Sequence, residues 1–182
     1  DMLTGAASIK EVEDMPLVRI TEHKMSDSQL CIKRAFDVVV ALSSLLLLSP
    51  LYILLYVLVW CSSKGPAIYK QERIGLHGVP FQILKFRTMR YDAEHNTPML
   101  SADNDSRITP LGSFLRKYRL DELPQMWNVL KGEMSVVGPR PERRYFIEQI
   151  EQQAPYYCLL YKIRPGLTSW GPVKVGYTDT IE

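Results

Sequence analysis

The stretch FDVVVALSSLLLLSPLYILLYVLVWC, residues 36–61, decides the fold of this chain. This run of about 26 mostly apolar residues exceeds the roughly 20 that a helix needs to cross the hydrocarbon core of a bilayer. A helix buried in a small soluble domain is the alternative, but apolarity on all sides over this length disfavours it. We therefore expect this segment to insert into a membrane.

Ser49 and Pro50 interrupt the run near its middle. Proline removes a backbone donor and clashes with the preceding turn, so it kinks a helix. Lys33 and Arg34 precede the run and Lys64 follows it, and positive charge favours the cytoplasmic side at both ends. A re-entrant helix that enters and leaves by one face satisfies both observations. A straight, tilted span satisfies only the length, and on these features both stay open.

The cysteines and the chain ends bear on compartment and completeness. Cys31, Cys61 and Cys158 are odd in number, widely spaced and without a Cys-x-x-Cys pair. This pattern disfavours a disulfide framework and a zinc site, and it favours a reducing, cytosolic face. The first residue is Asp1 rather than an initiator Met, so we expect the sequence to be part of a longer chain.

Charge is unevenly distributed although the net charge is only +2. Acidic residues outnumber basic ones up to residue 30, and the balance reverses between residues 64 and 144. Such a field suits an anionic substrate or anionic lipid headgroups. A solvated face of mixed charge is the ordinary alternative.

We predict an α+β fold, mostly α, in three parts. Residues 1–30 form the tail of a preceding domain and a linker, 31–62 a membrane segment of two helices around a break (helix-break-helix), and 63–182 a small cytosolic domain with amphipathic interfacial helices and a short β-hairpin. The expected elements are a strand at 16–20, a hairpin of 67–73 and 80–89, a surface loop at 91–107, and helices from Thr109-Pro110, from about 122 to 131 and from 141 to about 153.

Asp121 and Glu122 are the candidate chemical residues. Acids at a helix start often cap free amides and complement the helix dipole, which is the structural alternative. Arg116 precedes the pair and Arg140 follows it one helix later. Carboxylate oxygens are ligands that Mg²⁺ prefers together with phosphate oxygens, and a carboxylate can itself attack phosphorus. The pattern therefore favours phosphate chemistry.

Other site classes find little support in the sequence. No Walker-type loop, Gly-x-Gly-x-x-Gly or Gly-x-Ser-x-Gly motif is present, so phosphate binding must rest on side chains and helix N-termini. Residues 85–89 (KFRTM) interleave basic and other side chains as nucleic-acid binders do. The apolar run and the small net charge count against nucleic acid as a partner.

Six motifs in fixed order carry a resemblance to a known family. They are KRAFD (33–37), Ser49-Pro50, KFRTM (85–89), LDELPQMWNVLKG (120–132), MSVVGPRP (134–141) and RPGLT (164–168). The ordered set resembles the bacterial sugar transferase family, the polyprenol-phosphate phosphoglycosyltransferases of monotopic type. The leader before Lys33 is similar to the join found in longer members, whose catalytic part is C-terminal.

The resemblance implies a transferase that moves a sugar-1-phosphate from a UDP-sugar to undecaprenyl phosphate and releases UMP. This is the first membrane step of a surface polysaccharide: capsule, exopolysaccharide or O-antigen. It also favours re-entry, with Ser49 and Pro50 as the helix break. Residues 31–62 would then form a re-entrant membrane helix, and the site would lie on the cytoplasmic face of the bacterial inner membrane, in contact with membrane lipid. The oligomeric state stays open, with a homo-oligomer as one alternative.

The resemblance also implies residue roles. Asp121 is the nucleophile, forming a phosphosugar intermediate, and contacts the Mg²⁺ cofactor, while Glu122 is its catalytic partner. Substrate phosphates are bound by basic residues at family positions: Lys85, Arg116, Arg140 and Arg164. One departure is the sequence SWGPVKVG at 169–176, where the family often has Trp-Ala-Gln-Val-Asn-Gly; this bears on sugar specificity rather than on reaction type.

Three rival hypotheses make different predictions. A non-catalytic membrane anchor with a phosphate- or lipid-sensing domain would keep its function after Asp121→Asn. A membrane phosphohydrolase would release nucleotide without lipid. A straight single-pass protein would place the two flanks of the apolar run on opposite sides of the membrane.

Overall fold

The computed structural model describes residues 7–12, 15–20, 25–90, 105–153 and 155–169. The chain divides into two compact units, Asp1–Ala35 and Phe36–Glu182, which are described separately. In the first unit, β1 (Ala7–Val12) and β2 (Met15–Ile20) form an antiparallel hairpin. The strand expected at 16–20 is present, and β1 lies in a segment for which no strand was predicted.

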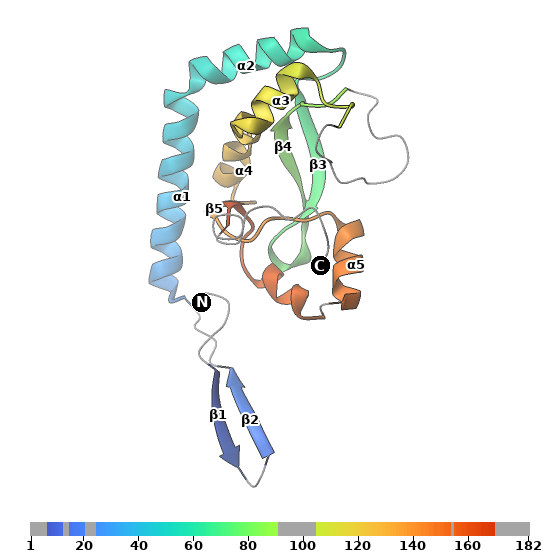
Figure 1. The fold of residues 1–182 in the computed structure, drawn as a ribbon. Helices are drawn as coiled ribbons and strands as arrows, with labels where there is room; N and C mark the ends of the chain where they lie inside the picture. Colours follow the sequence, from blue (N-terminus) through green and yellow to red (C-terminus); the bar gives the residue numbers. More distant parts are fainter. Residues whose placement is uncertain (1–6, 13–14, 21–24, 91–104, 154, 170–182) are drawn as a thin grey trace. The chain divides into compact units, whose positions relative to one another are not determined.

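Two helices carry the long apolar run. Helix α1 (Asp27–Leu47) crosses the boundary between the units, and α2 (Ser49–Ser62) follows after Leu48, with Pro50 in its first turn. The pair is bent by 66° at this break (Figure 1). Within the described residues no single helix is long and apolar enough to cross a membrane, whereas the bent pair together meets the same criterion of length and composition.

A β-hairpin follows the bent helix pair, as predicted. Strands β3 (Ile68–Ile74) and β4 (Pro80–Phe86) pair antiparallel around the short 3₁₀ helix η1 (Leu76–Gly78). In this turn His77 adopts a φ of 57° and Gly78 one of 76°. The second strand ends at Phe86 instead of residue 89, and one further bond in the same register follows it, from the Arg87 amide to the Ala67 carbonyl at 2.9 Å.

The predicted helices form, with two corrections. Helix α3 (Pro110–Lys117) begins where expected, because the Thr109 hydroxyl caps it by accepting from the Gly112 amide at 2.9 Å. The helix predicted from 122 to 131 is divided into the 3₁₀ helix η2 (Leu120–Glu122) and α4 (Gln125–Lys131). The left-handed backbone of Arg119 (φ 57°) separates η2 from α3, and Pro124, which has no amide hydrogen to extend a helix, lies between η2 and α4.

The second correction concerns the helix predicted from residue 141. Helix α5 (Arg144–Gln153) starts three residues later, because the preceding backbone is bound to β3: the Glu142 carbonyl accepts from the Ile74 amide at 3.0 Å. The 3₁₀ helix η3 (Pro155–Lys162) follows. Two three-residue strands that were not predicted, β5 (Ser135–Val137) and β6 (Gly166–Thr168), pair in parallel. Most of the loop predicted at 91–107 lies outside the described residues.

Two apolar clusters fix the helices on the hairpin. In one, Leu55 and Val59 of α2 pack with Phe86 of β4 and Leu115 of α3. In the other, Ala41 of α1 packs with buried side chains of β4, α4 and the segment before β5: Ile83, Val129 and Met134. Each fully buried side chain of this kind contributes about 1.5–3 kcal/mol. Both arms of the bent pair are therefore part of the core of the second unit.

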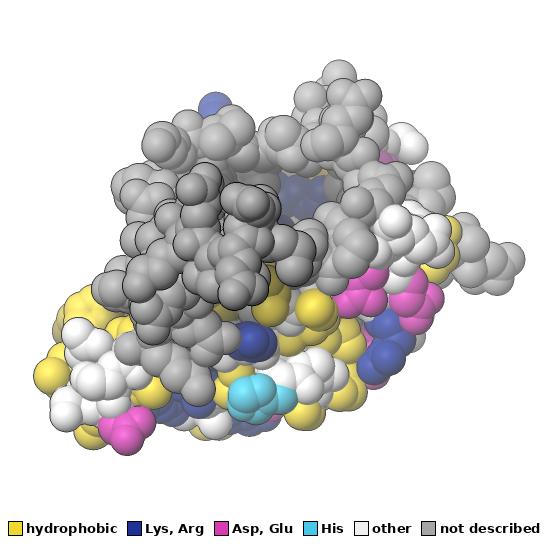
Figure 2. Space-filling view, turned by 90° about the horizontal axis from the view of Figure 1, so that it is seen from below, with side chains coloured by type: hydrophobic (Ala, Val, Ile, Leu, Met, Phe, Trp, Pro, Cys, Tyr) yellow, Lys and Arg dark blue, Asp and Glu magenta, His cyan; other side chains and the backbone are white. Residues whose placement is uncertain are grey.

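The outward sides of the same two helices remain apolar and exposed. The exposed side chains are Phe36, Val39, Leu42, Leu46, Leu47, Leu48, Ile53, Leu54, Tyr56, Val57, Leu58 and Trp60. Apolar surface of this extent marks a site of contact with a lipid or a protein. Where side chains are coloured in Figure 2, Lys and Arg lie beside apolar and acidic ones.

Candidate functional site

The carboxylate pair lies in the short turn η2, packed against β4. Asp121 and Glu122 are each only 7% exposed. The turn follows the left-handed Arg119, so the pair does not stand in the first turn of a regular α-helix. The capping alternative therefore lacks the helix start on which it depends.

Three cations surround one oxygen of Glu122. Oε1 lies 3.2 Å from Lys85 Nζ, 3.4 Å from an Arg119 nitrogen and 3.7 Å from an Arg140 nitrogen. Burial by itself raises the pKa of Glu122, but Lys85, Arg140 and Arg119 together hold it below its ordinary value. Glu122 is thus a charged residue that gathers basic groups from β4, the α3–η2 junction and the loop after β5.

Asp121 has a different environment. Its Oδ1 is buried and, within the described part of the chain, has no hydrogen-bond partner. Burial raises the pKa of Asp121, against the opposing fields of Lys85 and Arg116. Burial also lowers the pKa of Lys85, the cation nearest the pair. A buried polar atom without a partner is costly, so a functional reason for it is expected. This oxygen can accept a ligand or attack an electrophile.

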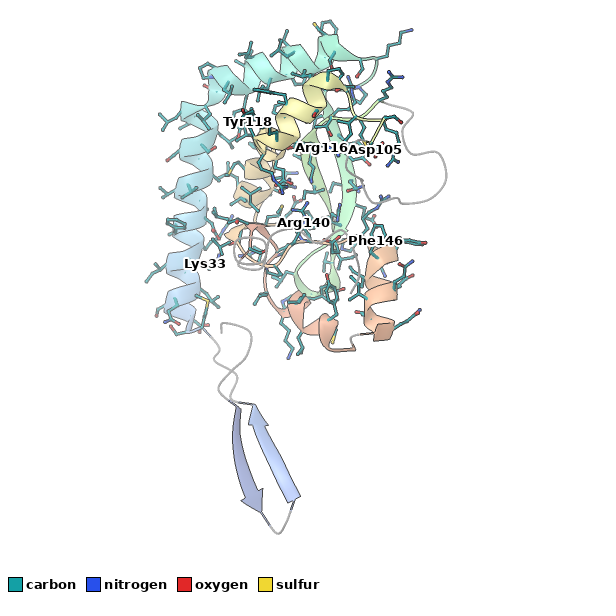
Figure 3. The ribbon with its side chains drawn as sticks, in the orientation of Figure 1. Lys33, Asp105, Arg116, Tyr118, Arg140 and Phe146 are labelled. Atoms are coloured by element: carbon teal, nitrogen blue, oxygen red, sulfur yellow. The ribbon has the colours of Figure 1, made fainter. Side chains whose placement is uncertain are left out.

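Arg116 and Arg140 lie on separate elements (Figure 3) and interact with the pair in different ways. Arg116, on α3, donates from Nε to the Thr88 hydroxyl at 2.9 Å and interacts electrostatically with Asp121. Arg140 lies after β5 and contacts Glu122 directly. A second basic residue of the hairpin, Arg73, bonds Glu142 at 2.9 Å on the same side.

Arg164 is brought near the Arg140 loop through its backbone. A Cβ built at Gly138 would lie 2.3 Å from the Arg164 carbonyl oxygen, so the two segments touch directly. The Nε of Arg164 is buried without a hydrogen-bond partner among the described residues. The structure thus joins Lys85, Glu122 and Arg140 by ion pairs, while it gives no side-chain contact between Arg164 and the carboxylates.

Four polar residues that support the site, three of them buried and Tyr52 partly buried, were not predicted as site residues. Asp37 on α1 bonds β5, the Tyr52 hydroxyl on α2 bonds the Leu123 carbonyl, Arg87 bonds carbonyls at the end of α2, and Asn128 bonds β4. Asp37 and Arg87 carried a signal, since each is a charge within or beside an apolar run. Nothing in the residue pattern alone distinguishes Tyr52 from the other tyrosines of its helix.

The pair fits a Mg²⁺ ion only if the substrate completes the shell. Among the described residues no group of three His, Cys, Asp or Glu side chains could hold a metal. Mg²⁺, however, usually binds one or two carboxylates plus substrate phosphates and water. The partnerless oxygen of Asp121 supplies one such ligand, whereas Glu122 Oε1 is already engaged by cations.

Comparison with known proteins places the chain in a family. The model of the family described as "Bacterial sugar transferase" matches residues 28–182. A UDP-N-acetylgalactosamine-undecaprenyl-phosphate N-acetylgalactosaminephosphotransferase of Aeromonas hydrophila is 38% identical, over 97% of this chain and 41% of its own length. A UDP-glucose:undecaprenyl-phosphate glucose-1-phosphate transferase of Escherichia coli K12 is 40% identical, over 96% of this chain and 38% of its own length.

A shorter relative, the exopolysaccharide production protein ExoY of Rhizobium meliloti, is 42% identical over 75% of this chain and 66% of its own length. The chain thus spans about two fifths of the length of the first two relatives and most of the third. The match to the family model covers both arms of the bent helix pair, the hairpin and the carboxylate turn. This chain belongs to the bacterial sugar transferase family.

Proposed function

We propose that this chain is a phosphoglycosyl transferase that moves a sugar-1-phosphate from a UDP-sugar to undecaprenyl phosphate and releases UMP. The names of the relatives include undecaprenyl-phosphate transferases for different sugars, N-acetylgalactosamine and glucose, so the donor is proposed only as a UDP-sugar. The product is a lipid-linked intermediate of a surface polysaccharide, as the name of the Rhizobium relative also suggests.

The observation that carries the proposal is the buried, partnerless Oδ1 of Asp121 among basic side chains. A carboxylate that only held the fold together would have its oxygens bonded. An oxygen kept free, beside Lys85 and Arg116, is instead suited to attack an electron-poor phosphorus. Glu122 is unsuited to that role, because its Oε1 is already engaged by Lys85, Arg119 and Arg140.

The proposed reaction has two displacements. The Asp121 carboxylate attacks the β-phosphorus of the donor, the bond from that phosphorus to the bridging oxygen breaks, and UMP leaves with the electron pair. A phosphate oxygen of undecaprenyl phosphate then attacks the same phosphorus and releases Asp121 as carboxylate. Two steps at one nucleophile let a soluble donor and a lipid acceptor use one site in turn.

The surrounding cations stabilise the negative charge that builds up on the transferred phosphoryl group. Lys85, Arg116 and Arg140 converge on the carboxylates, and arginine forks bind phosphate oxygens in pairs. Glu122 holds Lys85 and Arg140 in place in the absence of substrate. A Mg²⁺ ion held by Asp121 would add charge neutralisation at the diphosphate.

We also propose that the bent helix pair enters the cytoplasmic face of the bacterial inner membrane and returns to it. The exposed apolar side chains on α1 and α2 support contact with lipid, and the break before Ser49 supports re-entry. Phe114 on α3 and Trp127 on α4 are also exposed, and aromatic side chains of this kind suit the interface between membrane and water. A site beside this surface can meet a soluble donor and a lipid phosphate together.

The decisive experiment measures UMP release from a panel of UDP-sugars with Mg²⁺, with and without undecaprenyl phosphate. Asp121→Asn is compared with wild type and with Asp27→Asn, which alters an exposed carboxylate at the start of α1. We expect lipid-dependent release that is lost only in Asp121→Asn, and a phosphosugar adduct on wild-type protein given donor alone. Release without lipid would favour the phosphohydrolase hypothesis. No release from folded protein would favour the hypothesis of a non-catalytic membrane anchor.

The three native cysteines test re-entry. Cys31 precedes the bent pair, Cys61 lies at its end and Cys158 lies in η3, and all three are exposed. In single-cysteine variants, re-entry places all three within reach of a membrane-impermeant thiol reagent from the cytoplasmic side. A straight span would put Cys31 on the opposite side from Cys158.

A further inference from the structure

Two polar side chains of the bent helix pair reach into the elements that carry the site. Tyr52 of α2 donates its hydroxyl to the Leu123 carbonyl at 2.9 Å, one residue beyond Glu122. Asp37 of α1 accepts from the Ser135 hydroxyl at 2.8 Å and from the Val136 amide at 3.0 Å. These contacts lie on opposite sides of the break, one on each arm.

Membrane attachment alone does not account for these bonds. An anchor needs apolar surface, which α1 and α2 have in excess. A carboxylate on an apolar helix is costly to bury unless it is hydrogen-bonded, and Asp37 is 2% exposed. Both of its oxygens are used on β5, which connects the arm to one particular strand of the globular part.

Tyr52 holds the turn that presents the carboxylates. The internal bonds of η2 are long: Glu122 N to Arg119 O and Leu123 N to Leu120 O are each 3.3 Å. A single 3₁₀ turn with poor hydrogen-bond geometry does not fix its own side chains well. The hydroxyl of Tyr52 adds an outside support at the end of this turn, and the Tyr52 ring lies 6.4 Å from that of Phe86 on β4.

Asp37 holds the strand that leads to Arg140. Strand β5 has only three residues, and it is tied to β6 by the Ser135 amide on the Pro165 carbonyl at 2.8 Å. Beyond it, Gly138 and Gly166 approach so closely that a Cβ at Gly166 would lie 2.0 Å from the Gly138 nitrogen. The path from Asp37 to Arg140 is therefore short and rigid.

The two supports meet at one ion pair. Tyr52 fixes the turn that bears Glu122, Asp37 fixes the strand before Arg140, and the two charges lie 3.7 Å apart. We propose that the bent helix pair is a positioning device as well as an anchor: Tyr52 and Asp37, one on each arm, hold the carboxylate turn and the Arg140 loop in register. This inference rests on the proposed function, because register matters only if the two sides act on one substrate.

The test uses the full chain in lipid vesicles with the UMP-release assay. Tyr52→Phe removes one hydroxyl and keeps the ring; Tyr56→Phe, on the same helix at a half-exposed position, is its matched control. We expect kcat to fall on the order of tenfold in Tyr52→Phe, with KM for the donor and vesicle binding unchanged, since small misplacement of reacting groups is costly in rate. Tyr56→Phe should behave as wild type.

Asp37 is tested by rescue. Asp37→Ala removes both acceptors, whereas Asp37→Asn keeps an oxygen for the Val136 amide and an amide group that can donate to the Ser135 hydroxyl. We expect Asn to restore most of the kcat that Ala loses, in protein that still binds vesicles. If wild type is active and Tyr52→Phe and Asp37→Ala both keep full kcat, the positioning role is overturned while the transferase stands. If wild type releases no UMP, the proposed function and this inference fall together.

Discussion

Replacing Asn128 tests how the hairpin is held against the carboxylate turn. Its side chain is fully buried and accepts from the Leu84 amide at 3.1 Å, while its own amide donates to the Gln82 carbonyl at 2.7 Å and to Glu133 at 2.6 Å. It thus pairs with the free edge of β4 much as another strand would. Asn128→Ala removes three hydrogen bonds and takes the partner from two part-buried backbone groups, the Leu84 amide and the Gln82 carbonyl. At about 1 kcal/mol for each bond, this costs about 3 kcal/mol.

For a chain of this length, such a loss lowers the melting temperature by roughly 6–12 °C. The assay is thermal unfolding in detergent, with hydrogen exchange at the Leu84 amide as a local readout. Asn128→Asp should be worse than Ala above neutral pH, because its carboxylate would face the Gln82 carbonyl and Glu133. Acidification should protonate the new carboxyl and recover part of the loss. A melting temperature within 1 °C or so of wild type for Asn128→Ala would refute the reasoning.

Four further outcomes are expected. Burial raises the pKa of Asp121, so on acidification its carboxylate is protonated at a higher pH than that of an exposed aspartate, and kcat/KM should fall with it. Glu122→Gln removes a negative neighbour, so the acid limb of its residual activity should move to lower pH, and a move upward would contradict this electrostatic description. Chelation of Mg²⁺ should abolish UMP release, and added Mg²⁺ should restore that release. Full activity in the presence of chelator would refute a role for Mg²⁺. Gly112→Ala places a Cβ 2.0 Å from the Thr88 carbonyl and should lower the melting temperature, whereas Ala at the exposed neighbour Ser113 should not.

Local signals predicted the regular elements well. The Gly-rich turn between two extended stretches predicted the β3–β4 hairpin, and Thr109 with Pro110 predicted the start of α3. The predictions failed at helix boundaries that depend on a proline or on a contact with a distant strand. The helix predicted from 122 is divided at Pro124, which has no amide hydrogen, and α5 starts late because Glu142 is bound to Ile74.

The side chains of α4 show a second limit. In the sequence, Leu123, Met126, Trp127 and Leu130 form an apolar stripe at helical spacing, yet Trp127 is half exposed. The buried positions of the helix include Gln125 and Asn128, whose polar groups are used inside the fold. Apolar periodicity cannot identify such positions, because they are buried for their hydrogen bonds.

The candidate site was predicted in part. The ordered motifs predicted Lys85, Glu122 and Arg140 as site residues, and the structure joins them through one carboxylate oxygen of Glu122. Their roles as catalytic and substrate-binding residues stay predictions. The supports of the site could not be predicted, since the bonds of Tyr52 and Asp37 join residues 71 and 98 or more positions apart and leave no local pattern.

The parallel pairing of β5 with β6 bears on the order in which the protein is assembled during synthesis. The bent helices leave the ribosome first and the carboxylate turn later, but the amides of Ser135 and Gly138 find their acceptors only at Pro165 and Thr168. A nascent chain that ends within η3 therefore lacks the support of its Arg140 loop. Translation thus delays a complete site until the segment through residue 168 has emerged, well after the membrane arms are available for insertion.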